Sequence, residues 1–219
     1  LMNQGGLTHK LIAFNNALFG RVRGSLSHVN ISVSVFFAGL TGAAVTDTVA
    51  IGKIMIPEMK KQGYDAEYAA AVTACSSIIG PIIPPSVVMV VYATLLRDIS
   101  VIDLFAGGII PGLLMAVALL GVSFFLAWKR NYPKQAPTPF KMAVMSFVLA
   151  LPALVVPMII LGGILSGLTT ITEASGFAAV YAIVIGVVFY RNLTWRKIWQ
   201  ALVTTVRFSG VVFFLLATS

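Results

Sequence analysis

Residues 74–86 read ACSSIIGPIIPPS and interrupt an otherwise apolar stretch of the chain. The surrounding residues 68–96 contain no Asp, Glu, Lys or Arg, so their hydropathy is that of a membrane-crossing segment. Pro81, Pro84 and Pro85 lack a backbone N–H, and in a helix each proline ring clashes with the preceding turn. Three prolines so close together predict a break in the helix rather than a kink.

The break is predicted to separate two half-helices, at about residues 66–77 and 86–96, by an unwound segment. Non-helical backbone at membrane depth is tolerated only where it is buried in protein or lines a cavity. In transporters such broken helices form the sites for substrate and ions. The unwound backbone supplies carbonyl oxygens, and Ser76, Ser77 and Ser86 add hydroxyls beside it. The stretch is therefore a candidate binding site, with helix packing by the same small polar residues as the alternative.

The composition is that of an all-α polytopic membrane protein. Hydrophobic residues make up 58% of the chain and charged residues 10%, and the mean hydropathy is +0.96. The formal net charge is +8, but the basic residues cluster between apolar spans as in cytoplasmic loops, so no nucleic-acid partner is expected. The single Cys75 argues against an internal disulfide or a thiolate metal site, and no cofactor is expected. No catalytic motif or nucleophile–base pairing indicates an enzyme.

Residues 25–61 form a second candidate element. Their two apolar limbs are separated by the small, polar sequence TGAAVTDT at residues 41–48. At about 1.5 Å per residue each limb reaches about 16–24 Å, short of a hydrocarbon core of about 30 Å. The flanks on both sides are basic: Arg21, Arg23, Lys60 and Lys61. Because basic flanks prefer the cytoplasmic side, a re-entrant helical hairpin is favoured over one long helix with a small-residue packing face.

The remaining chain is divided by its basic loops. Residues 1–24 carry an amphipathic pattern that predicts an interfacial arm helix, and residues 62–128 contain the broken helix and the span that follows it. Residues 129–219 are expected to form further transmembrane helices after the basic loop 129–141. Glu173 is expected to cap one of these helices. The chain ends inside an apolar run, so it is interpreted as an internal fragment of a longer protein.

Two longer strings carry a family resemblance. The sequence FAGLTGAAVTDTVAIGKIMIPEMKKQGYDAEYAAAVTACSSIIGPIIPPS at residues 37–86, followed by LFAGGIIPGLL at residues 104–114, resembles the large membrane (permease) subunit of tripartite ATP-independent periplasmic (TRAP) transporters. The resemblance extends more weakly over residues 151–193. It implies one half of an elevator-type transporter, with the hairpin and broken helix in the transport domain and residues 129–219 in an incomplete scaffold. The family's second hairpin and second broken helix would lie beyond residue 219.

The resemblance also implies a function. It is sodium-coupled secondary active import of an organic acid, such as a C4-dicarboxylate or sialic acid, by a multi-pass protein of the bacterial inner membrane. Sodium is then the coupling ion, and the partners are a small TRAP membrane subunit, a periplasmic substrate-binding protein and membrane lipid. The alternative is a stand-alone sodium-coupled anion symporter of the same architecture. A purely structural subunit would not explain a costly break at membrane depth.

The residues that the resemblance implicates lie at the hairpin tip and in the break. Those assigned to the substrate are Thr41, Gly42, Ala43, Ala44, Thr46, Pro85 and Ser86. Those assigned to sodium are Thr41, Gly42, Asp47, Ser76, Ser77, Gly80, Pro81 and Pro84. Carbonyl and hydroxyl oxygens suit sodium, and helix N-termini at residues 47–49 and 86–88 suit a substrate carboxylate. Asp47 is interpreted first as the N-cap of the second limb, and otherwise as a sodium neighbour or a proton-coupled group.

Overall fold

The computed structural model describes residues 12, 14–16, 19, 20, 22–96, 98–134, 140–189 and 194–218. Within this part of the chain every regular element is a helix, so the predicted all-α class is confirmed. The elements are α2 (Ser25–Thr41), α3 (Ala44–Lys61), α4 (Ala66–Ser77), α5 (Val87–Leu95), α6 (Val101–Lys129), α7 (Phe140–Leu165), α8 (Ile171–Val184) with a π-helical continuation (Ile185–Phe189), and α9 (Trp195–Thr218). Most of the arm helix predicted for residues 1–24 lies outside the described residues.

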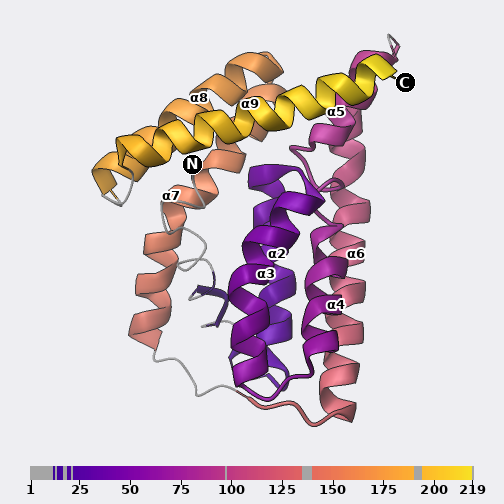
Figure 1. Ribbon diagram of the computed structural model, residues 1–219, viewed down its shortest axis with the longest axis vertical. Coiled ribbons are helices and arrows are strands. Elements are labelled where there is room, and N and C mark those ends of the chain that lie inside the picture. The colour runs from indigo at the N-terminus through magenta and orange to yellow at the C-terminus, as the bar shows by residue number, and fades with distance from the viewer. Residues whose placement is uncertain are drawn as a thin grey trace.

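The helices form an upright bundle with a second group across its upper end. Figure 1 shows α2, α3, α4 and α6 side by side, with α7 at the left and α8 and α9 over the top. Among the described residues, α6 and the segment Ile171–Val188 are long and apolar enough to cross a membrane. At about 1.5 Å per residue, the 29 residues of α6 extend about 43 Å. Helix α8 begins with a capping box in which Thr170 and Glu173 bond each other's backbone, as predicted for Glu173.

Helices α2 and α3 fold back on each other through a two-residue turn. Gly42 ends α2 with φ 60°, a left-handed conformation that glycine adopts without penalty, and its N–H donates to the Ala38 carbonyl at 3.1 Å. The alternative of one long helix is therefore wrong. The limbs of 17 and 18 residues extend about 26 and 27 Å, longer than the predicted 16–24 Å, because the turn takes only Gly42 and Ala43.

The break lies where the prolines predicted it. Helix α4 ends at Ser77 and α5 begins at Val87, within a residue of the predicted half-helices. Between them the chain makes only short turns, such as Gly80 N–H to Ser77 O at 3.0 Å and Ile82 N–H to Ile79 O at 3.0 Å. Residues 78–86 thus leave backbone groups outside any helical ladder.

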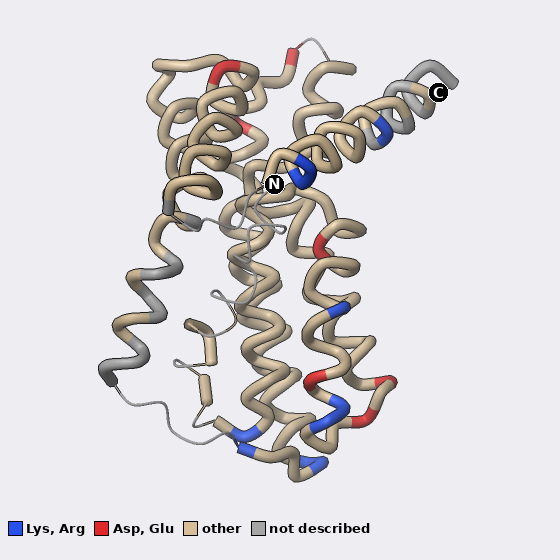
Figure 2. The backbone as a smooth tube through the Cα atoms, turned by 60° about the vertical axis from the view of Figure 1, so that its left-hand side comes forward, with Lys and Arg blue, Asp and Glu red and all other residues tan. Residues whose placement is uncertain are grey.

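Both basic ends of the α2–α3 hairpin lie at one end of the bundle. Arg23 precedes α2 and donates to Asn131 Oδ1 at 2.9 Å, just beyond the end of α6. Asp65, which follows α3 after a short turn, forms an ion pair of 2.6 Å with Arg130. Figure 2 shows several Lys and Arg positions, blue on the backbone tube, at this lower end. Both ends of the hairpin therefore lie at the same level, as a re-entrant hairpin requires.

The core is centred on α2. Apolar side chains such as Val29, Val33, Ile51 and Met55 are fully buried between α2 and α3. Polar side chains pair across the neighbouring faces: Asn30 Nδ2 donates to Thr73 Oγ1 at 2.7 Å, Ser34 Oγ and Ser76 Oγ bond at 2.9 Å, and Ser123 Oγ donates to Ser27 Oγ at 2.8 Å. Such buried bonds fix the register of α2 against α4 and α6.

Candidate functional site

The hairpin tip and the break meet at Gly42. Its carbonyl accepts a hydrogen bond from the Val87 N–H at 3.3 Å, which joins the end of α2 to the start of α5. Its Cα also faces the Pro85 carbonyl oxygen so closely that a Cβ would overlap it and lie 3.0 Å from Val87 N. Only glycine satisfies both the positive φ and this close approach. The structure therefore places the hairpin tip in direct contact with the break.

Asp47 does not cap α3, and that interpretation is wrong. Because the turn is short, α3 begins at Ala44 with Ala43 as its N-cap residue, and the Asp47 N–H already bonds the Ala43 carbonyl at 3.2 Å. The Asp47 side chain is completely buried and turns inward. Its Oδ1 accepts a hydrogen bond from Thr41 Oγ1 at 2.5 Å, across the turn.

The second carboxylate oxygen of Asp47 is directed at Gly80. Oδ2 is buried and has no hydrogen-bond partner among the described residues. A Cβ placed on Gly80 would lie 2.8 Å from this oxygen and 3.1 Å from the Ser77 carbonyl oxygen. A buried, unpaired carboxylate oxygen is costly, and oxygen ligands converging on it are what a hard cation prefers. Asp47, Ser77 and Gly80 therefore form an arrangement that fits a small cation.

The break supplies further oxygen atoms. No described residue donates a hydrogen bond to the carbonyl oxygens of Gly80, Pro84 or Pro85. The Pro81 carbonyl instead accepts the Ser86 hydroxyl at 2.6 Å, and the same hydroxyl caps α5 by accepting the Met89 N–H at 3.3 Å. Ser86 is thus the N-cap residue of α5, a role that was not predicted for it. Its bonds hold the start of α5, and the positive end of that helix dipole, against the tip.

Ser76 and Ser77 are both fully buried, and their hydroxyls already have partners. Ser76 Oγ donates to the Thr73 carbonyl at 3.2 Å and bonds Ser34 Oγ at 2.9 Å. Ser77 Oγ donates to the same Thr73 carbonyl at 2.7 Å. Ser76 therefore connects α4 to α2, whereas Ser77 contributes its backbone carbonyl beside Asp47. The structure brings Ser77, and not the Ser76 hydroxyl, to the unpaired carboxylate oxygen.

Two neighbouring cavities lie beside the tip. One, of about 330 Å³, is lined by Thr41 and Thr46 together with side chains of α2, α3, α7 and α8. The other, of about 290 Å³, is lined by Thr41, Pro85 and Ser86 together with side chains of α5, α6, α7 and α8. Four of the residues predicted to contact substrate therefore face open space, while Gly42, Ala43 and Ala44 line neither cavity.

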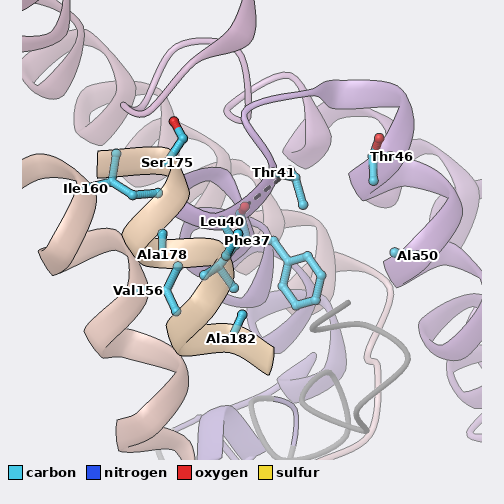
Figure 3. A pocket seen from close by; sticks show the side chains of 11 residues that line it. Phe37, Leu40, Thr41, Thr46, Ala50, Val156, Ile160, Ser175, Ala178 and Ala182 are labelled. Atoms are coloured by element: carbon cyan, nitrogen blue, oxygen red, sulfur yellow. Dashed lines mark hydrogen bonds between the residues drawn. The ribbon is translucent and has the colours of Figure 1, made fainter. Parts of the chain in front are cut away.

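Ser175 of α8 lines both cavities and was not among the predicted site residues. Figure 3 shows it on the wall formed by α7 and α8, opposite Thr41 and Leu40 of the hairpin. The sequence contains it in TITEAS at residues 170–175, but only the folded chain places that segment beside the tip.

The chain matches known proteins over its whole length. Residues 1–219 match the family model described as "Tripartite ATP-independent periplasmic transporter, DctM component". The chain is 36% identical over 218 residues to the sialic acid TRAP transporter permease protein SiaT of Haemophilus influenzae (strain 86-028NP), covering 100% of this chain and 35% of that protein. It is 39% identical over 212 residues to the sialic acid TRAP transporter large permease protein SiaM of Vibrio cholerae, covering 97% and 49%.

A third relative has a different named substrate. The 2,3-diketo-L-gulonate TRAP transporter large permease protein YiaN of Escherichia coli (strain K12) is 35% identical over 219 residues, which are 100% of this chain and 51% of that protein. The chain thus spans between a third and about half of the length of these relatives. All three are named as transporter permeases and none as an enzyme, in agreement with the sequence analysis. The chain belongs to the DctM component family of the tripartite ATP-independent periplasmic transporters.

Proposed function

We propose that this chain is the part of a TRAP large permease subunit that binds a coupling sodium ion and one side of an organic-acid substrate. The observation that carries the proposal is the buried Asp47 Oδ2, which has no partner among the described residues and faces Gly80 and the Ser77 carbonyl where tip and break meet. A carboxylate at membrane depth is expected to be neutralised by a partner, and a sodium ion supplies one.

The same geometry provides coupling between ion and substrate. With sodium beside Asp47, the carboxylate no longer repels an anion at the tip. The N-terminus of α5, capped by Ser86, adds a positive dipole end next to the cavity lined by Thr41 and Pro85. Sodium binding thus favours substrate binding, and by reciprocity the substrate favours sodium.

The substrate class comes from the relatives. Their names give sialic acid, 2,3-diketo-L-gulonate and C4-dicarboxylates, which are all organic acids. By the same similarity, the proposed partners are a small membrane subunit, a periplasmic binding protein that delivers the acid, and the lipid of the inner membrane. The hairpin and break would move together past α7 and α8 in an elevator motion. None of these relatives favours the stand-alone symporter.

The proposal is tested by uptake in proteoliposomes that contain the assembled permease, with the three acids offered on their binding proteins. Uptake of one acid is expected only with an inward sodium gradient and only when its binding protein is present. Uptake at an equal rate with potassium in place of sodium would contradict the coupling. Uptake of the free acid without any binding protein would instead favour the stand-alone symporter.

A further inference from the structure

The two cavities beside the hairpin tip share one wall that belongs to neither the tip nor the break. In the larger cavity this wall consists of Val156, Ile160, Ser175 and three alanines of α8. In the smaller one it consists of Ile160, Ile164, Ile171 and Ser175. Ser175 is therefore the single polar side chain that α7 and α8 contribute to the described lining of either cavity.

The opposite wall carries the residues already proposed to contact the substrate. Thr41 lines both cavities, Thr46 lines the larger one and Ser86 the smaller one. Figure 3 shows Ser175 and Thr41 on the two sides of the larger cavity, with Ala178 and Ala182 continuing the small-residue face of α8. A ligand that touches Thr41 from this space therefore has Ser175 as its polar neighbour across the cavity.

The Ser175 hydroxyl is available to a ligand. The side chain is exposed, and within the described part of the chain its Oγ donates only to the Ile171 carbonyl of its own helix, at 2.6 Å. Such a bond back to the preceding turn is easily exchanged for another acceptor, and the oxygen keeps its lone pairs for a donor. In an apolar cavity a few placed polar groups fix the orientation of the ligand.

We propose that Ser175 is a substrate-contacting residue on the α8 side of the site, where its hydroxyl bonds an oxygen of the organic acid held at the hairpin tip. The inference rests on the proposed transport function and adds to it a contact from the helices past which the tip would move. A residue in this position favours acids with hydroxyl or carboxylate oxygens on the side that faces away from the break. Ser175 thereby contributes to the choice among acids.

The first test compares Ser175→Ala with Ser175→Thr in the assembled permease. Ala removes the hydroxyl, whereas Thr restores it with one added methyl group. The matched control is Ser166→Ala, because Ser166, just after the end of α7, is also exposed and its hydroxyl also donates to a backbone carbonyl three residues earlier, Gly163 O at 3.1 Å, but it lines neither cavity. For Ser175→Ala we expect the KM for the acid to rise about three- to tenfold, the scale of one lost hydrogen bond, with the maximal rate changed less than twofold. Ser175→Thr recovers most of the KM, and Ser166→Ala matches the parent.

The second test is protection from a small thiol reagent. Cysteine is introduced at Ser175 or at Ser166 in a background in which Cys75, and any other cysteine of the subunit, is alanine. The transported acid is expected to slow labelling at position 175 and not at position 166. If the parent transports the acid, an unchanged KM in Ser175→Ala, together with labelling at position 175 that the acid does not slow, would overturn this inference but not the proposed function. Lower abundance and maximal rate at unchanged KM would show a structural role and overturn it as well. A parent that shows no sodium-driven uptake would overturn the proposed function itself.

Discussion

The buried Oδ2 of Asp47 faces Gly80, at 2.8 Å from where a Cβ on that glycine would stand. This relationship joins the second helix of the hairpin to the break, two segments whose contact the primary sequence does not display. It also explains the glycine in physical terms, because any side chain at position 80 would occupy the space in front of the carboxylate. The proposed sodium site, its coupling to substrate and the first prediction all rest on this pair.

Gly80→Ala is expected to abolish sodium binding while the protein still folds. The added methyl group takes the position from which a cation would reach Asp47 Oδ2 and the Ser77 carbonyl. The measurement is the sodium concentration for half-maximal uptake, which we expect to rise at least about tenfold, or uptake to be lost, because the methyl group fills the space for the ion beside Asp47 Oδ2. The control is Gly107→Ala on α6, where a Cβ meets nothing within 4 Å. Equal sodium curves for the two variants would contradict a site at this position.

Gly42→Ala is expected to separate the tip from the break. The substitution strains a residue with φ 60°, at a cost of about 1 kcal/mol, and drives the new Cβ into the Pro85 carbonyl. Gly63→Ala provides a matched control, because Gly63 has φ 85° but open space around it. Thermal unfolding of the purified variants should show a much larger loss of stability at position 42 than at 63. Similar losses would mean that only backbone strain, and not the contact with Pro85, matters.

The contacts of Asp65 with Arg130 and Tyr132, at the lower end of the bundle, should stabilise the folded protein in a way that acid removes. Hydrogen bonds from Tyr132 and Arg130 hold the pKa of Asp65 below its ordinary range. A lowered pKa in the folded state contributes stability that is present above the unfolded value of about 3.9 and is lost as the pH falls through the folded value. The Tm difference between the parent and Asp65→Asn is therefore expected to be positive at pH 7 and to vanish at pH values below that folded pKa.

The size of this effect is limited by solvent, because the Arg130 and Asp65 side chains are 47% and 59% exposed. Asp98→Asn, which removes an exposed carboxylate between α5 and α6, serves as the control. A parent that keeps its advantage over Asp65→Asn at the lowest pH would show that the contact does not depend on the ionised carboxylate.

The orientation of the hairpin predicts a labelling pattern. Arg23 and Lys61 flank α2 and α3 at the same end of the bundle, so cysteines at both positions should react only from the cytoplasmic side. Cysteines at Asp98 and Leu168, in turns between later helices, should react only from the periplasmic side. Labelling of positions 23 and 61 from opposite sides would contradict the hairpin, because both ends of a helical hairpin lie on the same side of the membrane.

What the sequence predicted well depends on local chemistry. Pro81, Pro84 and Pro85 break a helix whatever surrounds them, and the half-helices predicted on either side of the break correspond to α4 and α5. These features need no tertiary contact, so the predicted end of α4 and the predicted start of α5 agree with the structure within one residue.

Other features depend on contacts between distant segments. Because Gly42 ends α2 in a left-handed conformation, the turn takes only two residues and α3 begins at Ala44. Asp47 therefore lies inside the site and not at the N-cap position that was predicted for it. Its carboxylate faces Gly80, 33 positions further along the chain, and no spacing rule indicates that pair. Ser175 is further still from Thr41 in sequence and reaches the cavity only because α8 lies over the end of the bundle.

The central claim is that the hairpin tip and the break together bind the coupling ion, and the double variant Pro84→Ala, Pro85→Ala tests the contribution of the break most directly. An interior proline costs a helix about 3 kcal/mol relative to alanine, so the variant without sodium should be as stable as the parent or more stable. The same change gives residues 84 and 85 backbone N–H groups, which can bond the carbonyls of Gly80 and Pro81 in a helix and withdraw them from the site. The measurement is the sodium-induced shift in Tm of the purified proteins, alongside uptake in proteoliposomes. We expect a clear shift and uptake for the parent and neither for the double variant. An undiminished sodium shift with retained uptake in the double variant would contradict the account.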